Sequence, residues 1–183
     1  MLFPEEKYEL KGRKIILRPA RADEAEMLID YLKIINGETR FLTCDPDEVK
    51  HTVESEVEFI ENKNKSDNAM LMLAFVDGDY AGNCSFSTKS QSRRGKHRAE
   101  VGIALFLKYT NFGLGRLMLT RLIEKIKESG AEQAELKVNS ENARARHLYE
   151  SLGFVECGRI PNAFKYVDGT YADEISMVLQ FKK

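Results

Sequence analysis

The sequence predicts an α/β (α+β) fold, in which helices flank a mixed, mostly antiparallel central sheet of about seven strands. Two pairs of apolar-patterned segments are joined by Asp77-Gly78 and Asp168-Gly169, and an Asp-Gly pair at such a position is a strong signal for a β-hairpin. Between other strands the apolar residues recur with helical spacing, so hairpins are mixed with helical crossovers. A sheet connected in both ways carries helices on its faces.

The elements follow in order along the chain. Pro19 ends the first strand, Asp23 can cap the first helix, and Asn36-Gly37 ends that helix. The second helix has a sparse apolar stripe, whereas the third is more amphipathic and ends at Gly130. Strands are expected at 14–18, 69–76, 80–88, 99–107, 134–138, 155–165 and 170–181, and helices at 23–35, 47–62, 113–129 and 139–152.

The composition fits one domain spanning residues 1–183. With 28 Lys and Arg against 29 Asp and Glu, the net charge is −1, so no basic field indicates binding to nucleic acid or membrane. The three cysteines are scattered and the three histidines are isolated, which favours a reducing cytosol and no metal site. The first residues lack a signal peptide pattern, and no apolar run reaches the ~20 residues of a membrane span. We expect a cytoplasmic protein.

Residues 134–154, AELKVNSENARARHLYESLGF, are the most informative stretch. Asn139 or Ser140 can cap a helix that follows a strand, and Gly153 ends it. Asn142 lies in the first turn, where its amide either caps its own helix or faces a ligand. Tyr149 lies about two turns further on the same side. Its ring belongs to an apolar stripe, so it is a core residue, a site residue, or both.

The segment YTNFGLGRLML joins a strand to the third helix and is a candidate phosphate-binding loop. Gly113 and Gly115 allow the backbone to pass close to a ligand, and unpaired N–H groups at a helix start suit a pyrophosphate. Arg116 adds a positive charge. The alternative is a tight strand-to-helix turn. Met118 replaces the third glycine of a dinucleotide-binding fingerprint, and no P-loop is present.

The strand that precedes this loop has a candidate catalytic carboxylate. Glu100 shares one face of the strand with Gly102 and Ala104, and two small neighbours leave space for a substrate. The alternative is a strand-end Glu that points into solvent. The basic loop 93–98 leads into this strand, and either it is a solvated loop or it contacts an anion.

The pattern V-x-x-x-N-x-x-A-x-x-L-Y-x-x-x-G-F, together with the T-N-F-G-L-G loop, resembles the GCN5-related N-acetyltransferases. The resemblance covers about 13–181, and its specific motifs lie in 99–154. It implies the fold of that family and transfer of the acetyl group of acetyl-CoA to a primary amine by direct attack. The acceptor would be a small amine, amino acid, polyamine, antibiotic or protein N-terminus. No acyl-enzyme and no metal are implied.

The resemblance also assigns roles to residues. Glu100 would accept the proton of the amine, and the Tyr149 hydroxyl would protonate the departing thiolate. Two departures stand out, since Thr110 replaces the usual Gln or Arg and Lys137 stands where some members have Glu. The coenzyme would be held by backbone amides of Asn111, Phe112, Gly113, Leu114, Gly115 and Arg116, by the main chain of Ile103, Ala104 and Leu105, and by Asn142.

Two other functions remain open from the sequence. One is a coenzyme A-binding sensor that has lost turnover, and the other is an acyltransferase that uses a longer acyl-CoA. The last strands could also form an edge through which two chains pair as a homodimer.

Overall fold

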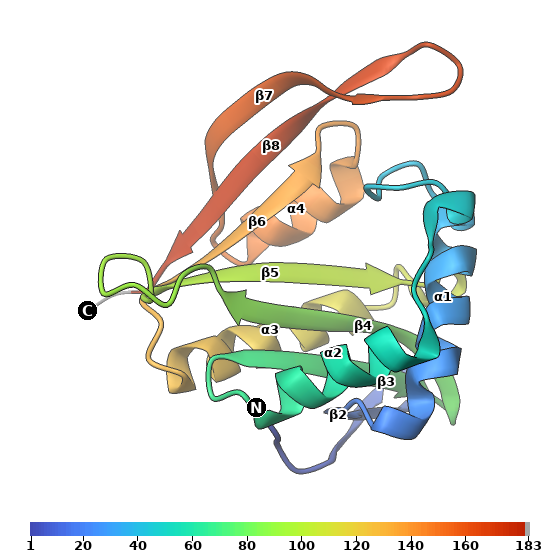
Figure 1. Cartoon of the computed structure of the whole chain (residues 1–183), viewed down its shortest axis with the longest axis vertical. Coiled ribbons are helices and arrows are strands. Elements are labelled where there is room, and N and C mark those ends of the chain that lie inside the picture. The colour runs from blue at the N-terminus through green and yellow to red at the C-terminus, as the bar shows by residue number, and fades with distance from the viewer. Residues whose placement is uncertain (182–183) are drawn as a thin grey trace.

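The computed structural model describes residues 1–181 and contains one 8-stranded sheet, in the order β1-β2-β3-β4-β5-β6-β8-β7 (Figure 1). Within these residues every neighbouring pair is antiparallel except β5–β6, which confirms the mixed, mostly antiparallel sheet. The strands are β1 (Glu6–Leu10), β2 (Arg13–Pro19), β3 (Ala69–Val76), β4 (Asp79–Thr88), β5 (Arg98–Leu105), β6 (Gln133–Asn139), β7 (Val155–Lys165) and β8 (Tyr171–Gln180).

Strand β1 corrects the expected start of the sheet, because the sequence pattern placed the first strand at 14–18. Lys11 and Gly12, with φ of 52° and 77°, make the tight turn of a β1–β2 hairpin. As an edge strand, β1 alternates exposed and half-buried residues and carries charges, so it lacks the apolar signal of a buried strand.

Two helices cover each face of the sheet (Figure 1). Helices α1 (Ala25–Glu38) and α2 (Val53–Lys65) lie in front in this view, and α3 (Leu114–Glu128) and α4 (Ala143–Ser151) lie behind. Strand β3 contributes side chains to the cores on both faces of the sheet. Its Met70 and Met72 belong to the larger core beneath α3, whereas Leu71 and Leu73 pack with Ile60 of α2.

The first two helices differ from the expected bounds. Helix α1 continues through Asn36-Gly37, and Asp23 lies in a 3₁₀ turn before it rather than at its cap. Helix α2 begins at Val53 instead of 47, because Thr52 and Ser55 form the capping box that starts it. The earlier Pro46 starts one 3₁₀ turn that is not continued.

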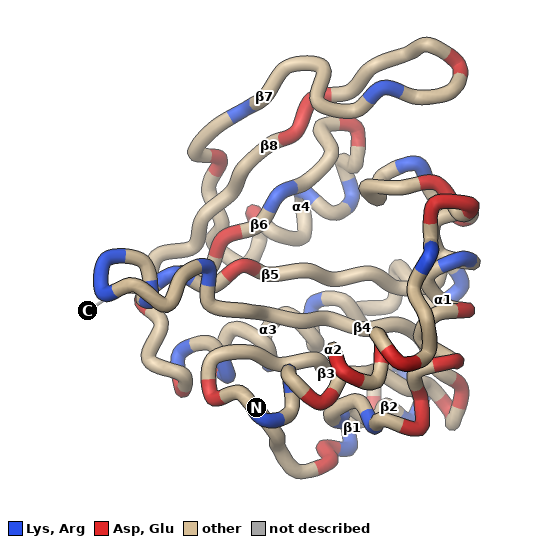
Figure 2. The backbone as a smooth tube through the Cα atoms, viewed as in Figure 1, with Lys and Arg blue, Asp and Glu red and all other residues tan. Residues whose placement is uncertain are grey.

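Strands β7 and β8 extend as an arm beyond the helices (Figure 1), and almost every residue of β7 is exposed. Charges of both signs are spread over the molecule, with acids prominent along α1 and α2 (Figure 2). The basic loop 93–98 leads into β5, whose first residue is Arg98, at the end of this strand opposite Leu105.

Candidate active site

The sheet opens between its two parallel strands. Strand β5 pairs with β6 only where Arg98–Glu100 face Gln133–Glu135, although β5 continues to Leu105 and β6 to Asn139 (Figure 1). The Phe106 N–H donates to the Ala81 carbonyl of β4 at 3.1 Å. Since backbone groups alternate in direction along a strand, the main chain of Ile103 and Leu105 is directed toward the gap.

A close approach between β4 and β5 shapes the end of this gap. Gly82 has φ of 137°, and a Cβ atom there would lie 2.4 Å from the Ala104 carbonyl oxygen. Only glycine fits, because backbone on both sides cannot move aside. The Tyr31 hydroxyl also donates to the Ala104 carbonyl at 2.7 Å, which fixes the strand from the α1 side.

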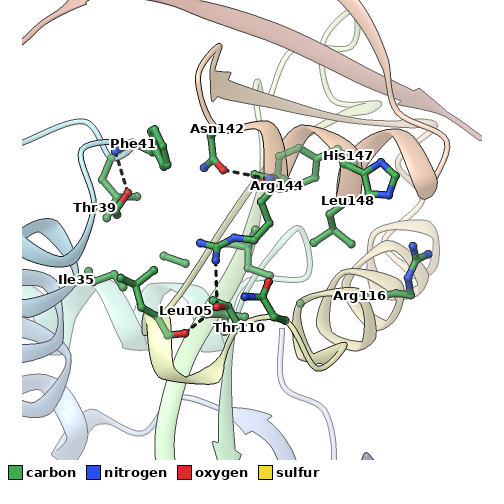
Figure 3. Close-up of a pocket in the computed structure, with 18 of the residues that line it drawn as sticks. Ile35, Thr39, Phe41, Leu105, Thr110, Arg116, Asn142, Arg144, His147 and Leu148 are labelled. Atoms are coloured by element: carbon green, nitrogen blue, oxygen red, sulfur yellow. Dashed lines mark hydrogen bonds between the residues drawn. The ribbon is translucent and has the colours of Figure 1, made fainter.

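A cleft of about 480 Å³ occupies the gap, between the ends of β5, α3, α4 and the chain that follows α1 (Figure 3). Its lining residues are Ile35, Thr39, Phe41, Leu42, Ile103, Ala104, Leu105, Leu107, Thr110, Asn111, Gly113, Gly115, Arg116, Asn142, Arg144, Ala145, His147, Leu148 and Tyr149.

The start of α3 presents backbone donors to this cleft. Asn111 and Gly113 have φ of 66° and 102°, which turn the chain sharply into the helix. The first intrahelical bond runs from the Leu117 N–H to the Gly113 carbonyl at 3.1 Å, so the three preceding N–H groups have no acceptor within the helix. Gly115 keeps the space open, since a Cβ atom would lie 3.2 Å from Leu148. This geometry suits an anion.

Helix α4 contributes Asn142 and Tyr149. Asn142 Oδ1 accepts from the Ala145 N–H at 3.1 Å, so this side chain caps its own helix while it lines the cleft. Tyr149 is 7 % exposed, and its ring packs edge-on against Phe154. Burial raises the pKa of Tyr149 to about 12. In residues 1–181 no hydrogen bond involves its hydroxyl, which therefore remains available to a ligand.

The structure brings most of the expected site residues together, with three exceptions. The Leu114 side chain is buried in the core and Phe112 packs against that core, so they can offer only their backbone to the cleft. Glu100 does not line the cleft; its side chain is 51 % exposed and lies 3.9 Å from Lys89. The catalytic role of Glu100 stays a prediction.

Sequence reasoning missed the cation that faces the loop. Arg144 Nη1 donates to Thr110 Oγ1 at 3.1 Å across the cleft (Figure 3). Arg144 lies in the first turn of α4, where a positive charge opposes the helix dipole. That unfavourable placement was the available signal for an anion site. Thr39, Phe41 and Leu42 were also missed, because the chain after α1 carries no recognisable pattern.

The chain after α1 is attached to the β7–β8 arm through Arg40. This guanidinium lies 2.9 Å from Glu141 and 3.7 Å from Asp168, and its carbon lies 3.9 Å from the centre of the Tyr166 ring. Since Thr39, Phe41 and Leu42 line the cleft, Arg40 connects one wall of the cleft to the arm.

Within residues 1–181, no group of His, Cys, Asp or Glu side chains is placed to hold a metal ion. Among the same residues, no helix is both long enough and apolar enough to span a membrane.

Comparisons with known proteins agree with this geometry. The [Ribosomal protein bS18]-alanine N-acetyltransferase of Escherichia coli is 40% identical over 77 residues, which are 42% of this chain and 51% of the relative. L-amino acid N-acyltransferase MnaT of E. coli is 29% identical over 91 residues, 50% of this chain and 53% of the relative. The chain thus spans about half the length of the curated relatives that it matches.

Solved structures match over nearly the whole chain. An acetyltransferase of the GNAT family from Streptococcus pneumoniae has a TM-score of 0.86 and 30% identity, and the match covers 91% of this chain and 99% of that one. The Salmonella typhimurium protein yncA, solved with its cofactor acetyl-CoA, has a TM-score of 0.80 at 20% identity, covering 92% and 95%. The model of the acetyltransferase (GNAT) family matches residues 32–154. The chain therefore belongs to the acetyltransferase (GNAT) family.

Proposed function

We propose that this protein transfers the acetyl group of acetyl-CoA to a primary amine. The observation that carries the proposal is the gap between β5 and β6, where unpaired strand backbone lies beside the donor-rich start of α3. An extended amide-containing arm can pair with that strand as a further strand would, and a pyrophosphate can bind the helix start. Acetyl-CoA carries both groups, and one structural neighbour was solved with it.

The anion-binding end of the cleft has two cations beside the backbone donors. Arg116 is held by Ser151, whose Oγ lies 2.6 Å from Nη2. Arg144 reaches Thr110 from α4, and this supplies a guanidinium at the place where the family usually has Gln or Arg. Although residue 110 is a threonine, Arg144 therefore provides a long polar side chain at the phosphate end of the cleft. Both arginines would bind the phosphates, and Asn142 and the main chain of Ile103–Leu105 would bind the pantetheine arm.

The amine must lose a proton before it can attack. An alkyl ammonium has a pKa near ~10.4, so a base is required at neutral pH. We assign Glu100 as this base, acting through a chain of water molecules. Glu100 precedes Ala104 by four residues, a distance of ~13 Å along a strand, which is too long for direct proton transfer or for transfer through one water. The amine nitrogen bonds to the thioester carbonyl carbon, the C–S bond breaks, and the thiolate takes up a proton.

Tyr149 would serve the leaving thiolate. With its pKa raised to about 12, the phenol is protonated at every physiological pH. A thiol has a pKa near ~8.5, so full proton transfer from this phenol would be uphill. Tyr149 would therefore stabilise the departing sulfur as a hydrogen-bond donor. The thiolate would take its proton from the attacking nitrogen, which loses that proton as the amide forms, or from water.

The first test is thermal stabilisation by acetyl-CoA, with ADP as the control ligand. At ~100 times its Kd, acetyl-CoA should add about 2.7 kcal/mol to the folded state, and ADP should add less. Longer acyl-CoAs compared at equal concentration test the acyl preference. Thiol release in the presence of amines then separates an enzyme from a coenzyme A sensor. Absence of any shift with acetyl-CoA would contradict the proposal.

A further inference from the structure

A second cavity, of about 820 Å³, lies on the other face of the sheet beneath α1 and α2. It shares three lining residues with the first cleft, namely Ile35, Leu42 and Ala104, so the two spaces meet at the end of β5. The remaining lining residues are Leu28, Tyr31, Leu32, Asn36, Thr43, Cys44, Glu48, Lys50, His51, Ser55, Glu56, Phe59, Leu71, Asn83 and Ser85.

One carboxylate in this cavity is buried. The side chain of Glu56 is 6 % exposed, whereas the other charged lining residues, Glu48, Lys50 and His51, are exposed at its rim. Within residues 1–181, the His51 imidazole lies beside the Glu56 carboxylate, with 3.4 Å between Nδ1 and Oε2. That imidazole is 53 % exposed, and it carries a charge only when protonated.

Four other shielded Glu side chains have a different environment. Each of these four side chains is at most 16 % exposed and forms an ion pair with an Arg or Lys. These pairs are Glu6 with Arg121, Glu24 with Arg18, Glu135 with Arg98 and Lys89, and Glu174 with Lys137. Glu56 is more deeply buried than any of these four, yet it has no permanent cation in the described chain.

The contrast extends to protonation. Ion pairing with arginine lowers the pKa of Glu6, Glu24 and Glu135, whereas burial raises the pKa of Glu56 despite His51. A buried carboxylate without a cation costs folding free energy. Such a group in a cavity is the pattern expected of a binding site that completes its ion pair with a ligand.

We propose that Glu56 binds a cationic group at the far end of the acceptor, so that the acceptor is a diamine or a lysine-like molecule. The proposal rests on the acetyl transfer proposed above. The reacting nitrogen lies where the two cavities meet at Ala104, and the second cation lies beside Glu56.

The spacing of the sheet sets the length of such an acceptor. Helix α2 packs on β3, and Leu73 of β3 is opposite Asn83 of β4, which is opposite Ala104 of β5. Two strand spacings amount to ~10 Å. Asn83 and Ser85 lie between and supply polar contacts along the way. Two nitrogens separated by five carbons are six bonds apart, or about 8 Å at ~1.3 Å per bond, and the inward reach of the Glu56 side chain covers the rest of the span.

The test compares 1,5-diaminopentane with 1-aminopentane, which lacks the second cation. Both are titrated into the coenzyme A-loaded protein by calorimetry, and kcat/KM is measured for both with acetyl-CoA. We expect the wild-type protein to prefer the diamine by roughly 10- to 100-fold, the range for a hydrogen bond to a charged group. Glu56→Gln should abolish that preference. Glu58→Gln, the same change at an exposed position of α2, should retain it.

Four controls make each outcome decisive. Thermal stabilisation of every variant by acetyl-CoA shows whether the coenzyme site is intact. Diamine binding is also measured without coenzyme A, so that binding in the second cavity can be detected even if the protein does not transfer acetyl groups. Glu56→Asp, which keeps the charge, should retain part of the preference. Glu56→Gln should not lower the melting temperature, since it removes a poorly paired buried charge. A preference retained in Glu56→Gln, or absent from the wild-type protein, would overturn the proposal.

Discussion

The two spaces on either side of β5 are built from different parts of the chain. The cleft at the β5–β6 gap presents backbone groups to a ligand, namely the amides near Gly113 and Gly115 at the start of α3 and the unpaired main chain of Ile103. The cavity beneath α1 and α2 is formed by side chains such as Glu56 and Asn83. A backbone donor is the same whatever residue carries it, whereas a side chain changes with one substitution.

This difference corresponds to the two substrates of the proposed reaction, the coenzyme and the acceptor. A coenzyme shared by many enzymes can be bound through strand backbone and a helix start, which the fold itself provides. An acceptor must be selected by polar side chains that the chain places individually. Substitutions in the first space should therefore act on the coenzyme, and those in the second on the acceptor.

Gly115→Val is expected to have the largest effect. A Cβ atom at this position already lies 3.2 Å from Leu148 and 3.6 Å from Leu105, so the branched side chain would extend into the cleft. We expect acetyl-CoA affinity to fall by at least ~100-fold, because the ligand would lose the backbone contacts at the start of α3. Isothermal calorimetry with acetyl-CoA measures this directly.

Gly37→Val is the matched control for Gly115→Val. Gly37 is also helical, and a Cβ atom there meets only Pro46 Cγ at 3.6 Å. This variant should keep its affinity for acetyl-CoA. Equal losses in the two variants would show that general damage to the fold, and not blockage of the cleft, is responsible.

Tyr149→Phe should have the next largest effect, on turnover rather than on binding. The ring would stay packed against Phe154, and the lost hydroxyl has no hydrogen bond in residues 1–181 to leave broken. We expect kcat to fall by roughly 10²-fold, the lower range for loss of a hydrogen-bond donor to developing negative charge, with the Kd for acetyl-CoA unchanged. Pre-steady-state thiol release measures the chemical step. A decrease confined to KM would contradict the assigned role.

The features of the β5–β6 cleft that depend on backbone could be predicted from the sequence better than the cavity beneath α1 and α2, which depends on side chains. Glycines and Asp-Gly turns are local signals, so the Asp77-Gly78 hairpin and the Gly113 loop could be located without a fold. The polar alternation of β1 hid that strand, because an edge strand need not be apolar on both faces.

Glu56 illustrates why the rest could not be predicted. The sequence pattern predicted an apolar stripe of Val49, Val53, Val57 and Ile60 on the second helix. In the structure Ile60 is buried and Val57 packs against its cluster, but Val49 lies outside the helix and Val53 is 46% exposed. Glu56 is buried as well. Periodicity assumes that the inward face of a helix meets an apolar core. Here part of that face meets a cavity, and a cavity forms only when distant segments pack together.

Arg40→Ala tests whether the chain after α1 must be held in place. Arg40 joins this chain to Glu141 and Asp168, and it stacks on Tyr166. Without it, the wall formed by Thr39, Phe41 and Leu42 should be less ordered, so KM for acetyl-CoA should rise severalfold while the melting temperature changes little. Arg40→Lys keeps the charge without the planar stacking, so its KM for acetyl-CoA should lie between those of the wild-type protein and Arg40→Ala. Unchanged kinetics in Arg40→Ala would mean that this connection does not position the cleft wall.

The smallest effect is expected at the closed end of the gap, where β5 and β6 still pair. Glu135 lies opposite Glu100 there, and it accepts hydrogen bonds from Arg98 and from Lys89, the latter at 3.0 Å. Chiefly through Arg98, these contacts lower the pKa of Glu135 to about 2. The folded state therefore binds this proton less readily than the unfolded state. The stabilisation is fully present above pH ~4.5 and is lost as the pH falls toward 2.

Glu135→Gln should lower the melting temperature at pH 7 by about 2–4 °C, because an ion pair near the surface contributes at most about 1 kcal/mol. The difference from the wild-type protein should shrink as the pH falls below 4.5, where the wild-type carboxylate also takes up its proton. Scanning calorimetry between pH 3 and 7 measures both. Because this pair holds the strands together just before they separate, Glu135→Gln should also weaken acetyl-CoA binding slightly. Reduced stability with unchanged binding would show that the gap is held open by the packing of α3 and α4 alone.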